Sequence, residues 1–359
     1  MSQLRTVQVL GGGAGSSAHV SSLAAGLIAR GVQVTVCAPD GAGRAQGLPA
    51  TGARFVAVPR RSDPAAVAAL RTACAGADIV HAHGLHAAVR AGIAISGRGT
   101  PLVVTWHSRV HAEGARGRLL RLLERRAARA AAVVLGTSWE LVDRARRRGA
   151  KDARLAPAAV PASRLAGTAD PGKTRAELGA VGRPLLVSAA QDGPDTLLDA
   201  VRAWRALDPV PLLVVVGEGT RLDALRRRIA DEGLPVVLAG GPEDIGVLLA
   251  AADAAVLSGR GEAGPLLAQE ALRLGVPLVA ARTGGLPELV GEAAAFVPPG
   301  DAASLAGAVV RLLGDPGQRE RLADAGRARA AAWPTEDDTI AHVLSVYDEL
   351  ARPPAGARG

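Results

Sequence analysis

Short apolar runs alternate along the chain with longer stretches whose apolar residues recur at helical spacing. In the first half, the runs have strand length and lie at 7–10, 32–37, 55–58, 79–81, 102–105 and 132–135. A second series follows at 185–188, 212–217, 236–239, 254–257 and 277–280. Apolar runs of this length between helical patterns are typical of parallel β-α-β units. The pattern therefore predicts an α/β protein with two doubly wound domains.

The segment between the two series, 157–184, is rich in Pro, Gly and Ala and has little apolar periodicity. This composition indicates a linker with one short helix. Helical patterns then cover 302–313, 316–332 and 340–350, and Pro334 lets the last of them leave in a new direction. We expect a first Rossmann-like domain over 1–164 and a second over 165–334.

Charge and aromatic content limit the classes of partner that the chain is expected to bind. The formal net charge is +8, but all basic residues except Lys151 and Lys173 are arginine, which points to a general composition bias. Aromatic residues make up only 2% of the chain, so the stacking platforms of nucleic-acid binders are lacking and no nucleic-acid partner is predicted.

The cysteines and the first residues of the sequence indicate in which cellular compartment the protein is expected to be found. Cys37 and Cys74 do not have Cys-x-x-Cys spacing, which fits a reducing cytosol. The first residues lack the pattern of a secretory signal, and no apolar run is long enough to span a bilayer. We therefore expect a cytoplasmic protein whose membrane contact, if any, is peripheral and on the inner face of the cell membrane.

A glycine-rich loop, Gly11–Ser16, follows the first predicted strand and opens a helix. Glycines allow a phosphate to approach the backbone, and the helix N-terminus offers unpaired N–H groups, so an anion or sugar-phosphate site is one interpretation. The loop also resembles a dinucleotide fingerprint, with Ser16 in place of the third glycine and Asp40 after the second strand. An NAD(P)-dependent oxidoreductase is thus one alternative, and a tight turn without a ligand is another.

Five of the seven histidines lie between positions 81 and 111. His81 and His83 end one predicted strand, and His107 follows the next. Because the carboxyl ends of parallel strands line the ligand crevice, these imidazoles are expected to face it. A metal site at the His-x-His pair is the alternative, but no carboxylate or cysteine set with ligand spacing accompanies it.

The segment 258–272 carries the strongest chemical pattern. A glycine-rich loop follows the strand at 254–257, and Pro265 occupies a favoured first position of a helix. The N–H groups at this helix start suit a diphosphate, and the Glu270 carboxylate can accept hydrogen bonds from a ribose diol. Glu262, in the loop, can meet a second group of the ligand. Thr283 and Gly284 form another turn at the end of the next strand.

These residues resemble a known family. Glu262-x₇-Glu270, followed by Gly284-Gly285-x-Pro287-Glu288, is similar to the signature of glycosyltransferase family 4 (group 1), whose members are retaining nucleotide-sugar transferases of GT-B fold. Further similarity lies at 78–83, 105–107, 195–200 and 216–219, so that it covers nearly the full length. The resemblance implies two Rossmann-like domains that face an interdomain cleft, with a C-terminal helix in 335–359 that crosses back to the first domain.

The resemblance also implies an activity and roles. The first domain would bind the acceptor and the second the donor, and a sugar would move from a nucleoside diphosphate to an unknown acceptor, with retention and without a metal or other cofactor. His107 and Glu262 are the expected catalytic residues, His107 near the reacting carbon and Glu262 on the transferred sugar. The expected donor-binding residues are Glu270 on the ribose, the N–H groups of Leu266 and Leu267 on the diphosphate, and Gly264, Arg260, Thr283, Gly284, Gly15 and Ser16.

One departure from the family opens a further alternative. After Val187 the family carries an arginine and a lysine that hold the donor phosphates, whereas this chain has Ser188, two alanines and then Asp192 a few residues on. Loss of two charge-assisted contacts would weaken donor binding or catalysis by roughly 10²- to 10⁴-fold. A non-catalytic GT-B protein is therefore an alternative to the enzyme, unless Arg260 or Arg282 compensates.

The segment Arg116–Arg129 places Leu119, Leu122 and Leu123 on one stripe among six arginines. Two interpretations are open. The leucines can pack on the sheet beneath a solvated helix, or the segment can contact anionic membrane, as in related transferases whose acceptors are linked to lipid. The acceptor is accordingly expected to be either lipid-linked or a small molecule.

Overall fold

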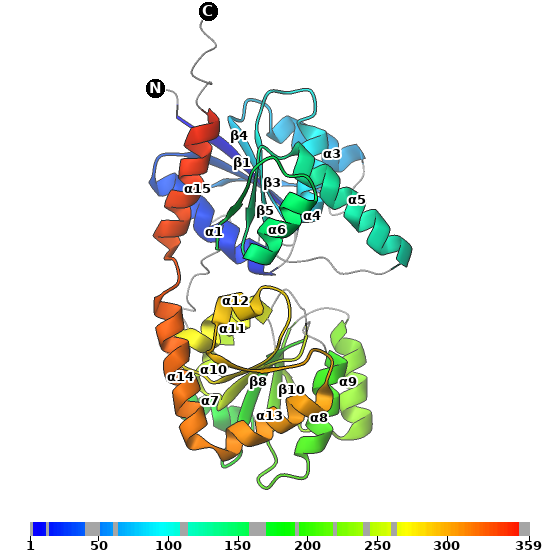
Figure 1. The fold of residues 1–359 in the computed structure, drawn as a ribbon, viewed down its shortest axis with the longest axis vertical. Helices are drawn as coiled ribbons and strands as arrows, with labels where there is room; N and C mark the ends of the chain where they lie inside the picture. Colours follow the sequence, from blue (N-terminus) through cyan, green and yellow to red (C-terminus); the bar gives the residue numbers. More distant parts are fainter. Residues whose placement is uncertain are drawn as a thin grey trace, which may run out of the picture. The chain divides into compact units, whose positions relative to one another are not determined.

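The structure is a computed structural model of the 359-residue chain. It describes residues 3–11, 14–39, 51–59, 64–107, 114–157, 170–190, 194–217, 221–239, 245–259 and 264–351. The chain divides into two compact units, the first formed by Met1–Pro161 with Pro334–Gly359 and the second by Ala162–Trp333. Each unit contains its own parallel sheet between helices (Figure 1). The predicted α/β class with two doubly wound domains is confirmed.

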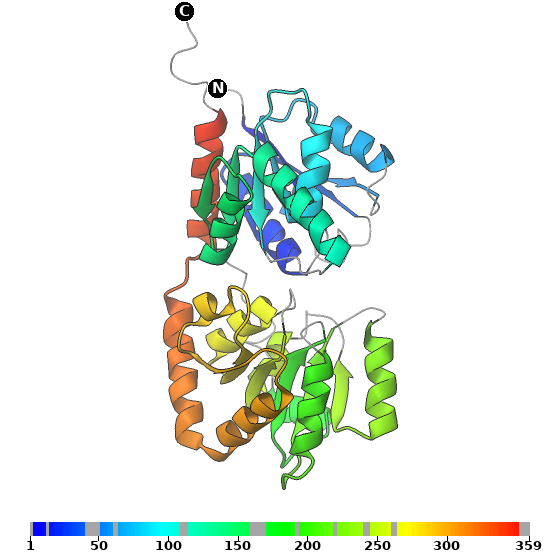
Figure 2. The same cartoon turned by 45° about the vertical axis from the view of Figure 1, so that its right-hand side comes forward.

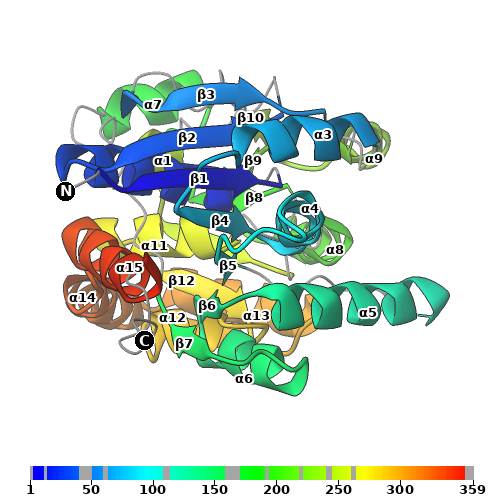
Figure 3. The same ribbon diagram turned by 90° about the horizontal axis from the view of Figure 1, so that it is seen from above.

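The first sheet has the strand order β3-β2-β1-β4-β5-β6-β7, and all neighbouring strands in it are parallel (Figure 3). Its strands are β1 (Arg5–Leu10), β2 (Gln33–Ala38), β3 (Arg54–Ala57), β4 (Ile79–His83), β5 (Leu102–Trp106), β6 (Val133–Gly136) and β7 (Ala153–Leu155). The direction of winding changes between β1 and β4, where Gln8 pairs with His81 and Leu10 with His83. In open parallel sheets ligands bind at the carboxyl ends of the strands beside such a point.

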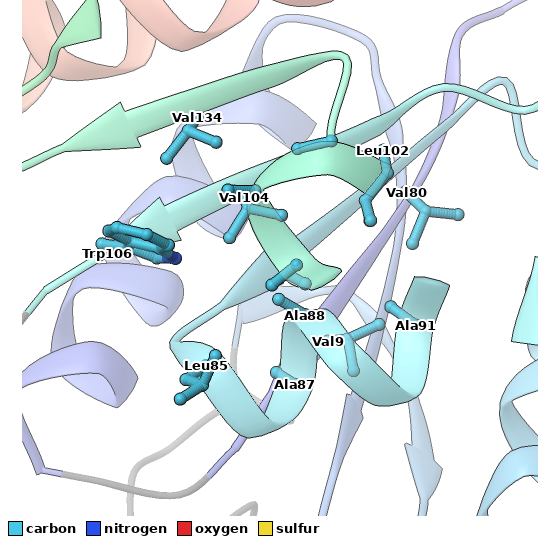
Figure 4. Packing of buried hydrophobic residues seen from close by; sticks show 14 of the residues in the cluster. Val9, Val80, Leu85, Ala87, Ala88, Ala91, Leu102, Val104, Trp106 and Val134 are labelled. Atoms are coloured by element: carbon cyan, nitrogen blue, oxygen red, sulfur yellow. The ribbon is translucent and has the colours of Figure 1, made fainter. Parts of the chain in front are cut away.

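Helices cover both faces of this sheet. They are α1 (Ala14–Ala29), α3 (Pro64–Ala73), α4 (Leu85–Ala94), α5 (Gly114–Ala130), α6 (Trp139–Arg147) and α15 (Glu336–Ala351). The core on one face contains residues of α3 to α6 together with Val9, Val80 and Val104 (Figure 4). The side chains of Ala87 and Ala91 in that core are small, so α4 can pack closely on the strands.

The last helix, α15, packs on the opposite face beside α1 (Figure 1). Its buried residues Ile340, Val343, Val346 and Tyr347 join one core with Val20, Leu23 and Leu27 of α1. The two helices meet closely, because a Cβ atom added at Gly26 would overlap the Ile340 side chain. The expectation that the C-terminal helix returns to the first domain is confirmed.

The second sheet has the order β10-β9-β8-β11-β12-β13, and all neighbouring strands in it are parallel. Its strands are β8 (Leu185–Ala189), β9 (Leu212–Val216), β10 (Val236–Ala239), β11 (Ala254–Leu257), β12 (Leu278–Ala281) and β13 (Ala294–Val297). The direction of winding changes between β8 and β11. The carboxyl ends of these two strands are therefore the second place where a ligand site is expected.

Two groups of helices cover the second sheet. One face carries α8 (Pro194–Trp204), α9 (Arg221–Glu232) and α13 (Ala302–Gly314), and Figure 2 shows α8 and α13 side by side in green and orange. The other face carries α7 (Pro171–Glu177), α10 (Ile245–Ala250), α11 (Gly264–Leu274), α12 (Leu286–Val290) and α14 (Pro316–Ala331). None of the described helices has the length and apolarity that a membrane span requires.

The sequence pattern missed two strands, β7 and β13. Both lie at the edge of their sheet and have three or four residues, so their extended state depends on pairing with β6 and β12. The predicted linker contains the expected short helix, α7, which Asp170 caps by accepting hydrogen bonds from the N–H groups of Gly172 and Lys173. The linker residues 158–169 lie outside the described part.

Candidate functional site

Polar side chains are buried together at the carboxyl edge of the first sheet. His81 and His83 lie two residues apart on β4 and therefore project to the same face as Thr105 of the neighbouring strand β5. Gln8 of β1 and Tyr347 of α15 meet them there. All five side chains are at most 2% exposed, so each polar atom needs a partner within the protein.

Hydrogen bonds connect these five residues into one network. The Gln8 amide donates from Nε2 to the Tyr347 hydroxyl over 3.0 Å, and that hydroxyl lies 2.6 Å from His81 Nδ1. His81 Nε2 lies 2.6 Å from Thr105 Oγ1. On its other side, Gln8 Oε1 lies 3.0 Å from His83 Nε2. Because a carbonyl oxygen only accepts, His83 Nε2 carries the proton and its Nδ1 is left as an acceptor.

His107 extends this network toward the surface. It follows β5, is half-buried, and places its Nε2 3.3 Å from His83 Nδ1, so that it donates to that nitrogen. His19 of α1 packs edge-on against both rings, with centroid distances of 5.8 Å to His83 and 5.2 Å to His107. The histidines of β4 and β5 thus gather at the sheet edge as predicted, together with a further one from α1.

Burial keeps the imidazoles neutral. It lowers the pKa of His81 to about 3, with a smaller contribution from the nearby His19. Burial also lowers the pKa of His83 and of His107 well below the usual value, and the neighbouring histidines add to both effects. Near pH 7 the three rings can therefore donate and accept hydrogen bonds, or bind a metal, without carrying charge.

In the second unit, α11 begins at Gly264 after the carboxyl end of β11, as predicted. Leu267 is buried in the core and Leu266 is half-buried, which anchors the first turn of the helix. Glu270 is 6% exposed, and its Oε2 lies 3.7 Å from Arg273 Nη1. This arrangement places a helix N-terminus and a nearly buried carboxylate on α11, which follows a strand at the change in winding direction.

Thr283 connects the loops after β11 and β12, because its hydroxyl donates to the Gly259 carbonyl over 3.0 Å. Gly284 follows with a φ of 54°, a left-handed conformation that disfavours other residues. The predicted Arg260 and Glu262 lie outside the described residues. Gly15 and Ser16 lie in the first turn of α1, where the structure describes their backbone alone.

The segment that departs from the family signature is partly described. Ser188, at the carboxyl end of β8, is fully buried, and its hydroxyl has no hydrogen-bond partner among the described residues. Asp192 lies outside the described residues. Of the two arginines left open as replacements, Arg282 holds its guanidinium 4.4 Å from the centre of the Phe296 ring.

The leucines of α5 divide between core and surface. Leu123 packs partly against the core, whereas Leu119 is 56% and Leu122 58% exposed. The interpretation that the whole stripe packs on the sheet is therefore wrong for two of its three members. The buried face of α5 is instead formed by Gly117, Leu120, Glu124, Ala127 and Ala128.

Sequence reasoning missed Gln8 and Tyr347. The signal for Gln8 was a polar residue within an apolar strand, which must have a buried partner. It also missed Arg90 of α4, which is 4% exposed and donates to the carbonyl oxygens of Leu10 and Pro59 over 3.4 and 3.2 Å. Arg90 thereby fixes the end of β1 just before the glycine-rich loop.

Comparison with known proteins identifies the family of both units. Residues 14–161 match the family described as "Glycosyl transferase 4-like domain", and residues 185–329 match "Glycosyl transferases group 1". A sucrose-phosphate synthase structure from Thermosynechococcus elongatus has the same fold, with a TM-score of 0.77, 21% identity, and coverage of 96% of this chain and 99% of that one.

Two curated relatives are actinobacterial mannosyltransferases. The MMP alpha-(1->4)-mannosyltransferase of Mycolicibacterium hassiacum is 38% identical over 30% of this chain and 27% of its own length. The GDP-mannose-dependent monoacylated alpha-(1-6)-phosphatidylinositol monomannoside mannosyltransferase of Corynebacterium glutamicum is 33% identical over 42% of this chain and 43% of its own. The matches thus span less than half of either relative. The two family matches together cover most of this chain, which belongs to the group 1 glycosyltransferases of family 4 and has the GT-B fold.

Proposed function

We propose that this chain is a retaining glycosyltransferase that moves a hexose from a nucleoside diphosphate sugar to an acceptor. The observation that carries the proposal is α11, whose N-terminus follows β11 and whose Glu270 carboxylate lies 3.7 Å from Arg273. A diphosphate gains from the unpaired N–H groups and dipole of a helix N-terminus. A carboxylate that accepts two hydrogen bonds from a ribose diol fixes the rest of the nucleotide.

In the proposed reaction the acceptor hydroxyl attacks the anomeric carbon on the face from which the diphosphate leaves. The bond between that carbon and the phosphate oxygen breaks, and the leaving phosphate takes the acceptor proton. The N–H groups of Leu266 and Leu267 would stabilise the charge on the diphosphate. His107 would contact the sugar through its neutral ring, and Glu262 would hold the sugar's hydroxyl groups. No metal ion takes part in this step.

A thermal-shift screen of nucleoside diphosphates and their sugars tests the donor site. A ligand at 100 times its Kd stabilises the folded state by about 2.7 kcal/mol. We expect one diphosphate to raise the Tm of the chain, and Glu270→Gln to remove that shift. Glu292→Gln is the matched control, because Glu292 is an exposed carboxylate of the same unit. A shift that persists in Glu270→Gln would refute the proposed ribose contact.

A non-catalytic GT-B protein is the second candidate, and one observation favours it. At the end of β8, where the family places cations, Ser188, Ala189 and Ala190 are buried and uncharged. Measurement of sugar transfer and donor hydrolysis separates the two candidates. Saturable nucleotide binding without release of nucleoside diphosphate would support the second candidate, whereas turnover lost in Glu270→Gln would support the enzyme.

We further propose that α5 brings the protein to an anionic membrane, where a lipid-linked acceptor would be found. Leu119 and Leu122 are exposed apolar side chains on a helix whose arginines are all exposed. The apolar side chains of such a surface can insert between the lipids, and its arginines are attracted to anionic headgroups. Sedimentation with phosphatidylglycerol vesicles tests the proposal. We expect binding that Leu119→Ser/Leu122→Ser weakens by about 10-fold or more, while Val181→Ser, at an exposed valine of the second unit, has no effect.

A further inference from the structure

Three imidazoles from different elements converge at the carboxyl edge of the first sheet. They belong to His19 of α1, His83 of β4 and His107 after β5, and one ligand atom of each lies within 4.8 Å of the other two. His83 Nδ1 and His107 Nε2 are 3.3 Å apart. Two nitrogens that bind one tetrahedral Zn²⁺ ion at about 2.0–2.1 Å also lie about 3.3 Å apart. This pair therefore already has the spacing of two ligands of one ion.

The chemical state of the rings suits a metal ion. His83 presents an unprotonated Nδ1, and His107 would bind an ion at Nε2 in the neutral tautomer that carries its proton on Nδ1. Gln8 accepts from His83 Nε2 over 3.0 Å, which leaves Nδ1 on the side of His107. A fixed partner on the far nitrogen is the usual companion of a metal-binding histidine, because it sets both the tautomer and the orientation of the ring.

His81, although adjacent, does not belong to this group. Its Nδ1 and Nε2 lie 2.6 Å from the Tyr347 hydroxyl and from Thr105 Oγ1, so both nitrogens are already engaged. The His-x-His pair that the sequence suggested as a metal site is thus divided. His83 faces the cluster, while His81 supports the network beneath it.

We propose that His19, His83 and His107 form a binding site for one late first-row divalent transition-metal ion such as Zn²⁺. Imidazole nitrogens favour Zn²⁺, Co²⁺, Ni²⁺ and Cu²⁺ over Mg²⁺ and Ca²⁺, which prefer oxygen. Three protein ligands leave a fourth coordination position for water or another small ligand. The half-buried His107 is the member of the trio through which an ion can enter.

The site goes beyond the proposed sugar transfer, which uses no metal, and it has a consequence for that reaction. An ion on His107 Nε2 would place a divalent charge on the ring that is expected to contact the sugar. Bound metal should therefore inhibit transfer, and a chelator should restore it. The binding experiment itself needs no donor, so failure of the metal site and failure of the proposed function are separate results.

Titration of the full chain, free of any histidine tag, with Co²⁺ tests the site. We expect visible d–d absorption that saturates at one ion per chain and is displaced by Zn²⁺. Replacement of one ligand, as in His19→Gln, His83→Gln or His107→Gln, should weaken binding by about 100-fold or more. Gln8→Leu should weaken it by about 10–100-fold, because His83 then loses the partner that fixes its tautomer.

His86→Gln is the matched control, because His86 is exposed on α4 and outside the trio. Circular dichroism checks that each variant is folded. If His83→Gln does not fold, His107→Gln carries the test, since its side chain is only half-buried. Binding that survives in all folded ligand variants, or that His86→Gln weakens equally, would overturn the proposal, as would the absence of saturable binding by the unaltered chain.

Discussion

Tyr347 connects α15 to the first sheet through two buried hydrogen bonds, and removal of its hydroxyl tests that connection. In Tyr347→Phe the ring stays, while Gln8 Nε2 keeps only its long contact of 3.5 Å with Thr6 Oγ1 and His81 Nδ1 loses its partner at 2.6 Å. A buried polar group left without a partner costs about 1–3 kcal/mol. We therefore expect the free energy of unfolding of the first unit to fall by about 3 kcal/mol.

Hydrogen exchange measured by mass spectrometry can assign this loss to one unit. Peptides from β1 and β4 should exchange faster in Tyr347→Phe. Peptides from β8 and β9 serve as the internal control, since they belong to separate cores of the second unit. A loss below about 0.5 kcal/mol in β1 and β4, the level of an ordinary surface substitution, would refute the reasoning. Equal losses in both units would refute it as well.

The chain contains one tyrosine, so its ionisation can be followed without interference. Burial raises the pKa of Tyr347 above its ordinary value, which is about 10. Above that pH the unfolded chain loses a proton that the folded chain keeps, so stability should fall by up to about 1.4 kcal/mol per pH unit. The ultraviolet absorbance of tyrosinate should appear at higher pH in the native than in the denatured chain. Coincident titrations would show that the hydroxyl is accessible to solvent.

Three further predictions concern packing and reactivity. Glu124→Gln should destabilise the first unit by about 3–5 kcal/mol in urea unfolding, because Arg144 and Arg148 would lose their buried charged partner at 2.6 and 2.7 Å. The control Asp143→Asn removes an exposed ion pair and should cost less than about 1 kcal/mol. Gly26→Ala should lower stability by about 1–3 kcal/mol through overlap with α15, and thermal unfolding should show recovery when Ile340→Val is added. Both cysteine thiols are buried, with pKa values raised to about 12 and about 11, so they should react with a thiol reagent only after denaturation.

The sequence predicted those parts of the fold that depend on local pattern. Central strands such as β4, β5, β8 and β9 are buried along their whole length, and each appears in the sequence as an apolar run between helical patterns. The position of His83 and His107 at a sheet edge followed from the same pattern, because parallel strands all end on one side. The start of α11 after β11 was predicted from Pro265 and the preceding glycines. Two of the edge strands, β7 and β13, lacked such a signal, whereas the edge strands β3 and β10 had it.

The partners of the buried polar groups could not be predicted, because they come from distant parts of the chain. Gln8 and Tyr347 are 339 positions apart, and nothing local to either indicates the other. A polar residue in an apolar strand shows only that a partner is required. Which residue supplies the partner depends on how α15 packs against α1. That packing requires a residue without a side chain at position 26, where Gly26 meets Ile340. The last helix thus has a role that its amphipathic pattern does not reveal: it completes the polar network beneath His83 and His107, so the orientation of both rings depends on α15 remaining docked.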